Sequence, residues 1–352
     1  MKKIFLLLTS LSFFNFYAQN TPLYVGTYTN YESEGIYRLQ FNTETGELSE
    51  KELAIATENP SFLTFSKNKK VIYSVSEGQK SAVTAFKLKP NGKLEFLNTQ
   101  SSNGRGPCHV SVNTNSTKAV VSNYGAGTVS IYNLNDDGSL NEASQVFDHN
   151  SKSEKSHAHS AQFYKKDLFV SDLGRNGVYQ YQLKKDAYQL KSSSIIKTEG
   201  NPGPRHFSIS KNGKFIYIIN EYGSSITTAK KTKKGFKQID HDSTLDENYT
   251  GKNSCADIHL SKDERFLYGS NRGENSIAVF KRNIKTGTID KIQNISVHGD
   301  WPRNFTLDPT GKFVLVANRK SNNIAVYSID STTGKLTFSK DYAVPTPVCL
   351  LF

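Results

Sequence analysis

Four side chains that can bind anions or transfer protons occupy two positions of a repeated segment: His159, Arg205 and Arg303 the first, and Glu221 the second. A planar guanidinium matches the geometry of a carboxylate or a phosphate. An imidazole or a carboxylate can accept and return a proton. Together these residue types indicate a site that holds an anion and moves a proton beside it. The alternative is that the charges pair with one another and tie neighbouring segments together, because buried charges are costly unless they are paired or used.

The segment that carries these residues is a strand, a tight polar turn and a second strand. Residues 204–221 show it clearly, with Asn212-Gly213 between two apolar runs, which is a strong hairpin signal. The same position of the unit recurs at residues 61, 108, 159, 205, 256 and 303, in steps of 47, 51, 46, 51 and 47. Repetition at such a period is typical of propellers and other repeat architectures.

A seventh copy of the unit is divided between the two ends of the chain. One further step of 45 residues from position 303 reaches Val348, after which only one strand remains. The missing partner strand is Leu23–Tyr28. Each complete unit continues through a third strand and a turn such as Thr286-Gly287 to a fourth strand. The sequence therefore predicts an all-β, seven-bladed β-propeller of four-stranded antiparallel blades, whose last blade is closed jointly by the N- and C-terminal strands.

Two rings of residues are expected at one mouth of the central channel. The start of one strand and the end of its antiparallel neighbour lie at the same edge of a sheet. Ring one comprises Ser61, Cys108, His159, Arg205, Ala256, Arg303 and Val348. Ring two comprises Glu77, Tyr124, Leu173, Glu221, Arg272, Arg319 and Tyr28. Equivalent positions hold dissimilar polar groups, which indicates a binding or catalytic mouth rather than uniform packing.

The N-terminus reads as a secretory signal peptide, residues 1–18, with Lys2 and Lys3 before an apolar run. We expect residues 19–352 to form a single propeller domain that is periplasmic or secreted. The apolar run is too short for a membrane span, so no membrane anchor is expected. The formal net charge of +12 favours an anionic partner. Nucleic acid is not expected, because the basic stretch at residues 230–234 lacks an aromatic platform.

The three cysteines, Cys108, Cys255 and Cys349, fall in three different blades, so no disulfide is expected among them. They show no spacing typical of a metal site, and Arg and His predominate over carboxylates among the ring residues. We therefore expect neither a metal nor another cofactor. A closed propeller needs no partner for stability and a monomer is expected, although the sequence does not determine the oligomeric state.

Several segments resemble one known family, the lactonase-type propellers. This family includes the bacterial propeller-type 6-phosphogluconolactonases and the fungal carboxymuconate-lactonising cycloisomerases. The resemblance covers the whole chain after the signal peptide. The matching segments are Leu23–Thr29, Gly35–Tyr37, Thr45–Leu48, Gly203–His206, Asn220-Glu221, Ser270–Gly273 and Trp301–Arg303.

The resemblance implies a lactonase whose active-site His, two Arg and Glu fall on His159, Arg205, Arg303 and Glu221. We expect metal-independent hydrolysis of a sugar or carboxylate lactone, with a small anionic lactone or sugar acid as the substrate. Either Glu221 or His159 would act as the general base, and the two arginines would hold the substrate anion or the oxyanion. Further substrate-binding groups are expected from neighbouring positions: His109, His206, Arg272 and Asn304.

Two other classes of function remain open at this point. A lactonising cycloisomerase or lyase would share the anion-binding arginines and differ in the proton-transfer step. A non-catalytic propeller would bind a ligand or a protein, because a fold alone does not fix a function. The sequence does not identify the lactone. An export signal argues against 6-phosphogluconolactone itself, which is made in the cytoplasm.

Overall fold

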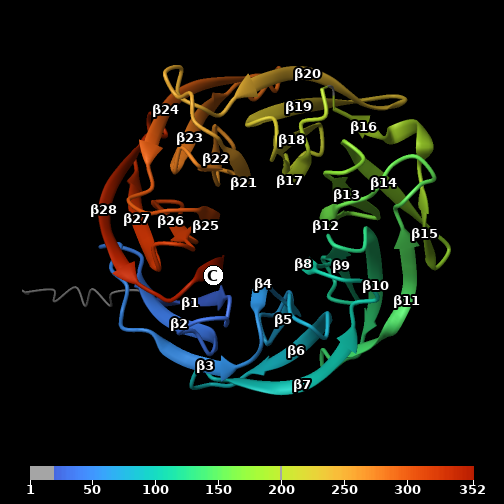
Figure 1. Ribbon diagram of the computed structural model, residues 1–352, viewed down its shortest axis with the longest axis horizontal. Helices are drawn as coiled ribbons and strands as arrows, with labels where there is room; N and C mark the ends of the chain where they lie inside the picture. Colours follow the sequence, from blue (N-terminus) through green and yellow to red (C-terminus); the bar gives the residue numbers. More distant parts are fainter. Residues whose placement is uncertain (1–19, 199) are drawn as a thin grey trace, which may run out of the picture.

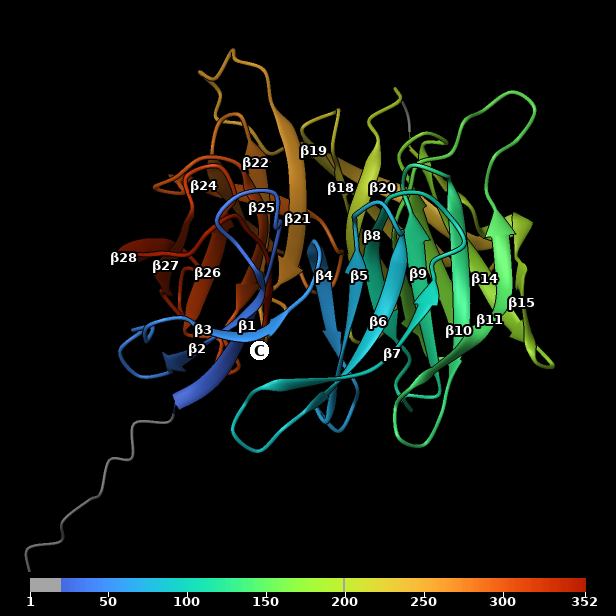
Figure 2. The same cartoon turned by 60° about the horizontal axis from the view of Figure 1, so that its bottom comes forward.

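The computed structural model describes residues 20–198 and 200–352, which form seven antiparallel sheets around a central axis (Figure 1). The sheets follow one another around the ring in chain order, so the predicted seven-bladed propeller is confirmed. Figure 2 shows inner strands such as β4 and β21 standing upright beside the axis, with loops above and below them. The predicted signal peptide lies outside the described residues. Within these residues no helix is long and apolar enough to cross a membrane.

Blades 1 to 3 occupy the first half of the ring, and their strands are given from the axis outward. Blade 1 contains β4 (Pro60–Phe65), β5 (Val71–Ser76), β6 (Ala82–Leu88) and β7 (Leu94–Ser101). Blade 2 contains β8 (Pro107–Val112), β9 (Lys118–Asn123), β10 (Thr128–Leu134) and β11 (Leu140–Asp148). Blade 3 contains β12 (Ala158–Tyr164), β13 (Asp167–Asp172), β14 (Gly177–Lys184), β15 (Ala187–Leu190) and β16 (Ile196–Lys197).

Blades 4 to 7 complete the ring in the same order. Blade 4 contains β17 (Pro204–Ile209), β18 (Phe215–Asn220), β19 (Ser225–Thr232) and β20 (Gly235–Ser243). Blade 5 contains β21 (Ser254–Leu260), β22 (Phe266–Arg272), β23 (Ser276–Arg282) and β24 (Ile289–Ser296). Blade 6 contains β25 (Pro302–Leu307), β26 (Phe313–Asn318), β27 (Asn323–Ile329) and β28 (Leu336–Ala343). Blade 7 contains β29 (Pro347–Leu351), β1 (Asn20–Thr27), β2 (Gly35–Asn42) and β3 (Glu52–Ala56).

Blade 7 closes the ring as the sequence predicts, with C-terminal β29 pairing antiparallel to N-terminal β1. Gly26 lies opposite Cys349 in this pairing. A Cβ atom at position 26 would collide with the carbonyl oxygen of Pro60 in blade 1, so glycine allows the neighbouring blade to approach. The closure gives β29 a partner strand and joins the two ends of the chain within one blade.

The outer strand of blade 3 differs from the prediction of four strands per blade. β15 and β16 both pair with β14, and the short 3₁₀ helix η1 (Ser192–Ser194) lies between them. The fourth strand of this blade is therefore interrupted rather than continuous. The Ser194 side chain donates a hydrogen bond to the side-chain oxygen of Gln180 in β14 and so holds the interrupted segment against the blade.

Seven apolar clusters hold the blades together, one at each junction between adjacent blades. Tyrosines of the second strands also connect neighbouring blades through hydrogen bonds. The Tyr268 hydroxyl in blade 5 donates to the carbonyl oxygen of Gly334 in blade 6 at 3.1 Å, and Tyr217 donates to Gly287 at 2.9 Å. Both glycines have positive φ values, +74° and +89°, which the tight turns before the outer strands require. Residues of the repeat thus stabilise the packing between adjacent blades as well as the fold of each blade.

Candidate active site

A β-bulge marks the ring-one position in every blade. In blade 4, Pro204 pairs with Asn220 and His206 pairs with Ile219, so Arg205 is the extra residue. The same register shift occurs at the corresponding place in the other six blades. A bulge re-aims a side chain out of the regular alternation of a strand. Six of the seven ring-one residues accordingly line one small cavity on the axis.

Glu221 lies between two arginines at the mouth. Arg205 Nε and Arg272 Nη2 are each 3.0 Å from its Oε2 atom, which joins blade 4 to blade 5. Arg205 also donates to the carbonyl oxygen of Ala256, and Arg272 donates to that of Cys255 at 2.8 Å. Burial, followed by the neighbouring Arg272 charge, lowers the pKa of Arg205 to about 10, so this side chain remains protonated at neutral pH. Glu221 is the counter-ion of this pair.

Arg303 approaches the axis from β25 of blade 6. Its Nη2 atom lies 3.5 Å from Glu77 Oε2 of blade 1, across the jointly closed blade 7. The Tyr28 hydroxyl donates to the same Glu77 oxygen at 2.6 Å, and burial raises the pKa of Tyr28, so this hydroxyl stays protonated. The guanidinium of Arg319 covers the Tyr28 ring at 4.6 Å. Arg303 and Glu77 are only half-buried, so this part of the site opens toward solvent.

Three buried imidazoles lie inside the channel. The His206 ring centroid is 5.0 Å from that of His159 and 5.6 Å from that of His109. Burial, and then the charge of Arg205, lowers the pKa of His159 well below its ordinary value and that of His206 to about 4. Burial, and then His206, lowers the pKa of His109 in the same direction. All three rings are therefore neutral at neutral pH.

Asp257 connects three of the side chains around the channel. Its Oδ1 atom is 2.7 Å from His206 Nδ1, and its Oδ2 atom is 3.0 Å from His259 Nε2. The Asn304 amide nitrogen donates to Oδ2 at 2.5 Å, while the amide oxygen of Asn304 accepts from Leu350 N–H at 2.7 Å. Burial by itself would raise the pKa of Asp257, but His259 and His206 outweigh it and hold that pKa well below the usual range.

The axial cavity has a volume of about 10 Å³. Five of the eight predicted site residues line it: His159, Arg205, His206, Arg303 and Asn304. The other three do not. Glu221 and Arg272 lie at the mouth, and His109 packs against the Phe62 ring, with 4.3 Å between the centroids.

The prediction of site residues missed three groups, Tyr28, Glu77 and Asp257. Tyr28 and Glu77 belong to ring two, and Asp257 directly follows the ring-one residue Ala256. Their positions in the repeat could therefore have identified them as site residues. What the sequence does not show is that Glu77 pairs with an arginine two blades away. Among the described residues, no group of three or more His, Cys, Asp or Glu side chains has the geometry to hold a metal ion.

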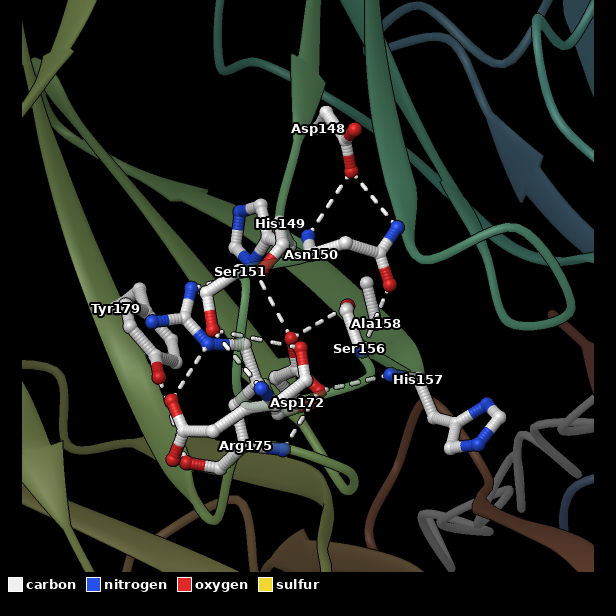
Figure 3. A network of polar contacts seen from close by, with 12 residues as sticks. Asp148, His149, Asn150, Ser151, Ser156, His157, Ala158, Asp172, Arg175 and Tyr179 are labelled. Atoms are coloured by element: carbon white, nitrogen blue, oxygen red, sulfur yellow. Dashed lines mark hydrogen bonds and ion pairs between the residues drawn. The ribbon is translucent and has the colours of Figure 1, made fainter.

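A buried polar network fixes the loop between β11 and β12 at this mouth (Figure 3). Asp172 accepts hydrogen bonds from the Ser156 hydroxyl at 2.6 Å and from His157 N–H at 2.9 Å, and its Oδ2 atom lies 3.3 Å from His149 Nδ1. The His157 ring then stacks on Tyr124 of ring two, with 4.5 Å between centroids. The network is a structural anchor for one side of the mouth.

The chain is similar to proteins of one family along its whole described length. The family model for "Lactonase, 7-bladed beta-propeller" matches residues 22–352. The 6-phosphogluconolactonase of Bacillus subtilis is 35% identical over 342 residues, which covers 94% of this chain and 97% of the relative. The 6-phosphogluconolactonase of Formosa agariphila is 35% identical over 335 residues, covering 89% and 94%. The periplasmic gluconolactonase of Pseudomonas aeruginosa has the same fold, with a TM-score of 0.88 at 27% identity over 94% and 98% of the two chains.

Proposed function

This chain belongs to the seven-bladed β-propeller lactonase family, and we propose that it hydrolyses an anionic sugar or carboxylate lactone at the mouth formed by rings one and two. The observation that carries this proposal is the convergence of Arg205 and Arg303 with the neutral imidazoles of His159 and His206 on one axial cavity, with Arg272 at its mouth. A site of this kind combines an anion clamp with groups that accept protons. These are the two requirements of lactone opening.

The three arginines supply positive charge, which stabilises the reacting lactone once its carbonyl is attacked. The tetrahedral intermediate places a negative charge on the former carbonyl oxygen, and prearranged donors stabilise it. Arg303 is the most accessible of the three, since its side chain is 15% exposed, against 2% for Arg205 and 5% for Arg272. Its partner Glu77 is half-buried and 3.5 Å away. We assign Arg303 to the substrate anion or oxyanion, and Arg205 with Arg272 to the electrostatic field behind it.

Proton transfer falls to the imidazoles rather than to Glu221. One carboxylate oxygen of Glu221 already serves two guanidinium groups at 3.0 Å, so its charge is engaged in holding them. His159 is buried and neutral, and it lines the axial cavity. A neutral imidazole can accept a proton directly. The structure thus favours the buried imidazoles of the cavity over Glu221 for exchange of protons with the reacting oxygens.

Metal-independent catalysis is favoured by the charges of the mouth. Arg205, Arg272 and Arg303 present guanidinium groups there, and Glu221 and Glu77 are already paired with them. A divalent cation at this place would meet like charge. The oxyanion stabilisation that a metal provides in other hydrolases is available here from arginine.

We propose that the N-terminal segment directs export, so that the enzyme binds its anionic substrate outside the cytoplasm. The lysine pair and apolar run of residues 1–18 support a periplasmic or secreted location. A relative that is described as a periplasmic gluconolactonase supports it further. A sugar-acid lactone fits this location better than a phosphorylated intermediate of the cytoplasm.

The test is a screen of sugar and carboxylate lactones with residues 19–352, followed by acid release in a pH-stat. Hydrolysis that is faster than the spontaneous rate and is slowed in Arg303→Ala supports the proposal. Arg265→Ala is the matched control, because Arg265 pairs with Asp263 on the surface at 2.6 Å. The reverse reaction is followed with the corresponding hydroxy acids. Binding without any turnover would instead identify a non-catalytic propeller.

A further inference from the structure

His206 forms a buried dyad with Asp257 that the proposed reaction has so far not used. The side chains come from neighbouring blades, β17 and β21, and His206 Nδ1 lies 2.7 Å from Asp257 Oδ1. Because this nitrogen faces a carboxylate, it carries the ring proton in the neutral imidazole. The other nitrogen, Nε2, is left with a lone pair. It is buried and has no hydrogen-bond partner among the described residues.

Asp257 is fixed as an ionised acceptor. Besides His206, its oxygens accept hydrogen bonds from Ile258 N–H at 2.9 Å and from the Asn304 amide at 2.5 Å. His259 Nε2 lies 3.0 Å from Oδ2. These donors hold the carboxylate of Asp257 in one orientation. The carboxylate in turn stabilises positive charge on the adjacent imidazole of His206.

His206 shares the axial cavity with a second residue that has an unsatisfied ring nitrogen. His159 Nδ1 is also buried without a hydrogen-bond partner in the described part of the chain, and both residues line the cavity. The cavity volume of about 10 Å³ is close to what one water molecule requires. Arg205 and Arg303 line the same cavity, so a water molecule there would lie beside the proposed oxyanion donors.

We propose that this cavity holds the attacking water, that His206 is its general base, and that Asp257 is the positioning residue of that base. This inference rests on the proposed lactone hydrolysis. The water O–H bond breaks, its proton moves to His206 Nε2, and the electron pair of that bond forms the new C–O bond to the lactone carbonyl. The ring C–O bond then breaks, and the leaving alkoxide takes the proton from the imidazolium. The product acid ionises and releases one proton to solvent.

His206 is better suited to this step than the two bases that the sequence suggested. Of the three central imidazoles in the described residues, only His206 contacts a carboxylate that stabilises its imidazolium form. His159 instead faces the positive charges of Arg205 and Arg303. His159 is therefore assigned to hold the water, through Nδ1, while His206 takes the proton.

The charged and titratable groups around His206 determine its pH dependence. Arg205 lies on its own strand, Asp257 and His259 on β21, His159 on β12 and His109 on β8. Burial and Arg205 lower the pKa of His206 to about 4, whereas Asp257 raises it. The base is thus neutral and active across the range above pH 5, and removal of the Asp257 charge lowers the pKa further.

The experiment combines kinetics with a measurement of the histidine tautomer. In His206→Asn and Asp257→Asn we expect kcat on the best lactone of the screen to fall at least ~100-fold, with KM within about threefold. Asp308→Asn is the matched control for folding, since Asp308 is a buried aspartate that accepts from Phe313 N–H at 2.7 Å in the turn between β25 and β26, at the end of the blade away from the mouth. It is expected to lower the melting temperature but to keep the shape of the kcat–pH profile.

The tautomer is measured by nitrogen-15 NMR of the histidine rings in the wild-type protein. This measurement does not depend on whether any variant folds. The expected state of His206 is the Nδ1–H form, and loss of that form is expected in Asp257→Asn. Wild-type hydrolysis that survives in both His206→Asn and Asp257→Asn would overturn the assignment of the base and leave the proposed function intact. An Nε2–H tautomer in the wild type would overturn it as well. No hydrolysis of any lactone by the wild type overturns the proposed function, and this base with it.

Discussion

The substitution Glu221→Gln separates a counter-ion from a catalytic base at the same position. Glutamine keeps the size of the side chain but removes the charge that Arg205 and Arg272 share, each at 3.0 Å. Both guanidinium groups are buried, and they would then lack their carboxylate partner. Removing one member of a buried ion pair costs about 3–5 kcal/mol, because the remaining charge stays desolvated.

This cost predicts a measurable shift in melting temperature. An unfolding entropy of about 2.1 cal/mol/K per residue gives roughly 0.7 kcal/mol/K for 352 residues. The expected decrease is therefore about 4–7 °C for Glu221→Gln. Thermal unfolding followed by circular dichroism measures it. Glu154→Gln is the matched control, since Glu154 also faces two cations, Arg175 at 3.1 Å and Lys197 at 3.8 Å, but at the surface. Its expected cost is below about 1 kcal/mol.

The kinetic result distinguishes the two roles. As a counter-ion, Glu221 affects the pH profile of kcat little at a temperature where the variant is folded. A melting temperature within 1 °C of the wild type, together with a loss of at least ~100-fold in kcat, would refute this reasoning and restore Glu221 as the base.

Three further outcomes follow from the same structure. Arg303→Ala should lower kcat/KM for an anionic lactone by about 10- to 150-fold, the worth of a charged hydrogen bond; an equal effect on uncharged lactones would contradict a role in binding the substrate anion. Tyr268→Phe should cost about 1–2 kcal/mol in unfolding free energy, because the Gly334 carbonyl loses its donor; unchanged unfolding in urea would argue against this bond between the blades. Folding stability should fall as the pH drops below about 6.5, the unfolded pKa of histidine, since His109, His159 and His206 have lowered pKa values when folded and bind protons only on unfolding or at lower pH. Urea titrations between pH 8 and 4 test it, and a flat profile would show that these rings are not buried in the neutral form.

Much of the fold could be predicted because the repeat is local. The Asn212-Gly213 turn, the apolar runs beside it and the spacing between copies depend on residues that are close in the chain. The same spacing predicts that Val348 lacks a partner strand at the C-terminus and that Leu23–Tyr28 supplies it. The interruption of the outer strand in blade 3 could not be predicted, since the contact that holds it joins Ser194 to Gln180, a residue 14 positions earlier in the chain.

The candidate site was predicted less completely, because its residues act through partners that are distant in the sequence. Glu221 read as a possible base until the structure placed Arg272 of the next blade on the same oxygen as Arg205. His206 read as a substrate-binding residue until its distance of 2.7 Å from Asp257 became visible. Neither relation follows from residue type or spacing.

The sequence by itself determined the seven blades, the strand pairing that closes them and the rings of residues that share one mouth. It could do so because strand alternation and turn chemistry set which side chains lie at the same edge of a sheet. Only the tertiary structure decided which charges are paired, which nitrogen atoms are free and how large the axial cavity is. These properties arise where bulged strands from different blades meet at the axis, and electrostatic and packing interactions over a few ångströms depend on positions that the repeat alone does not specify.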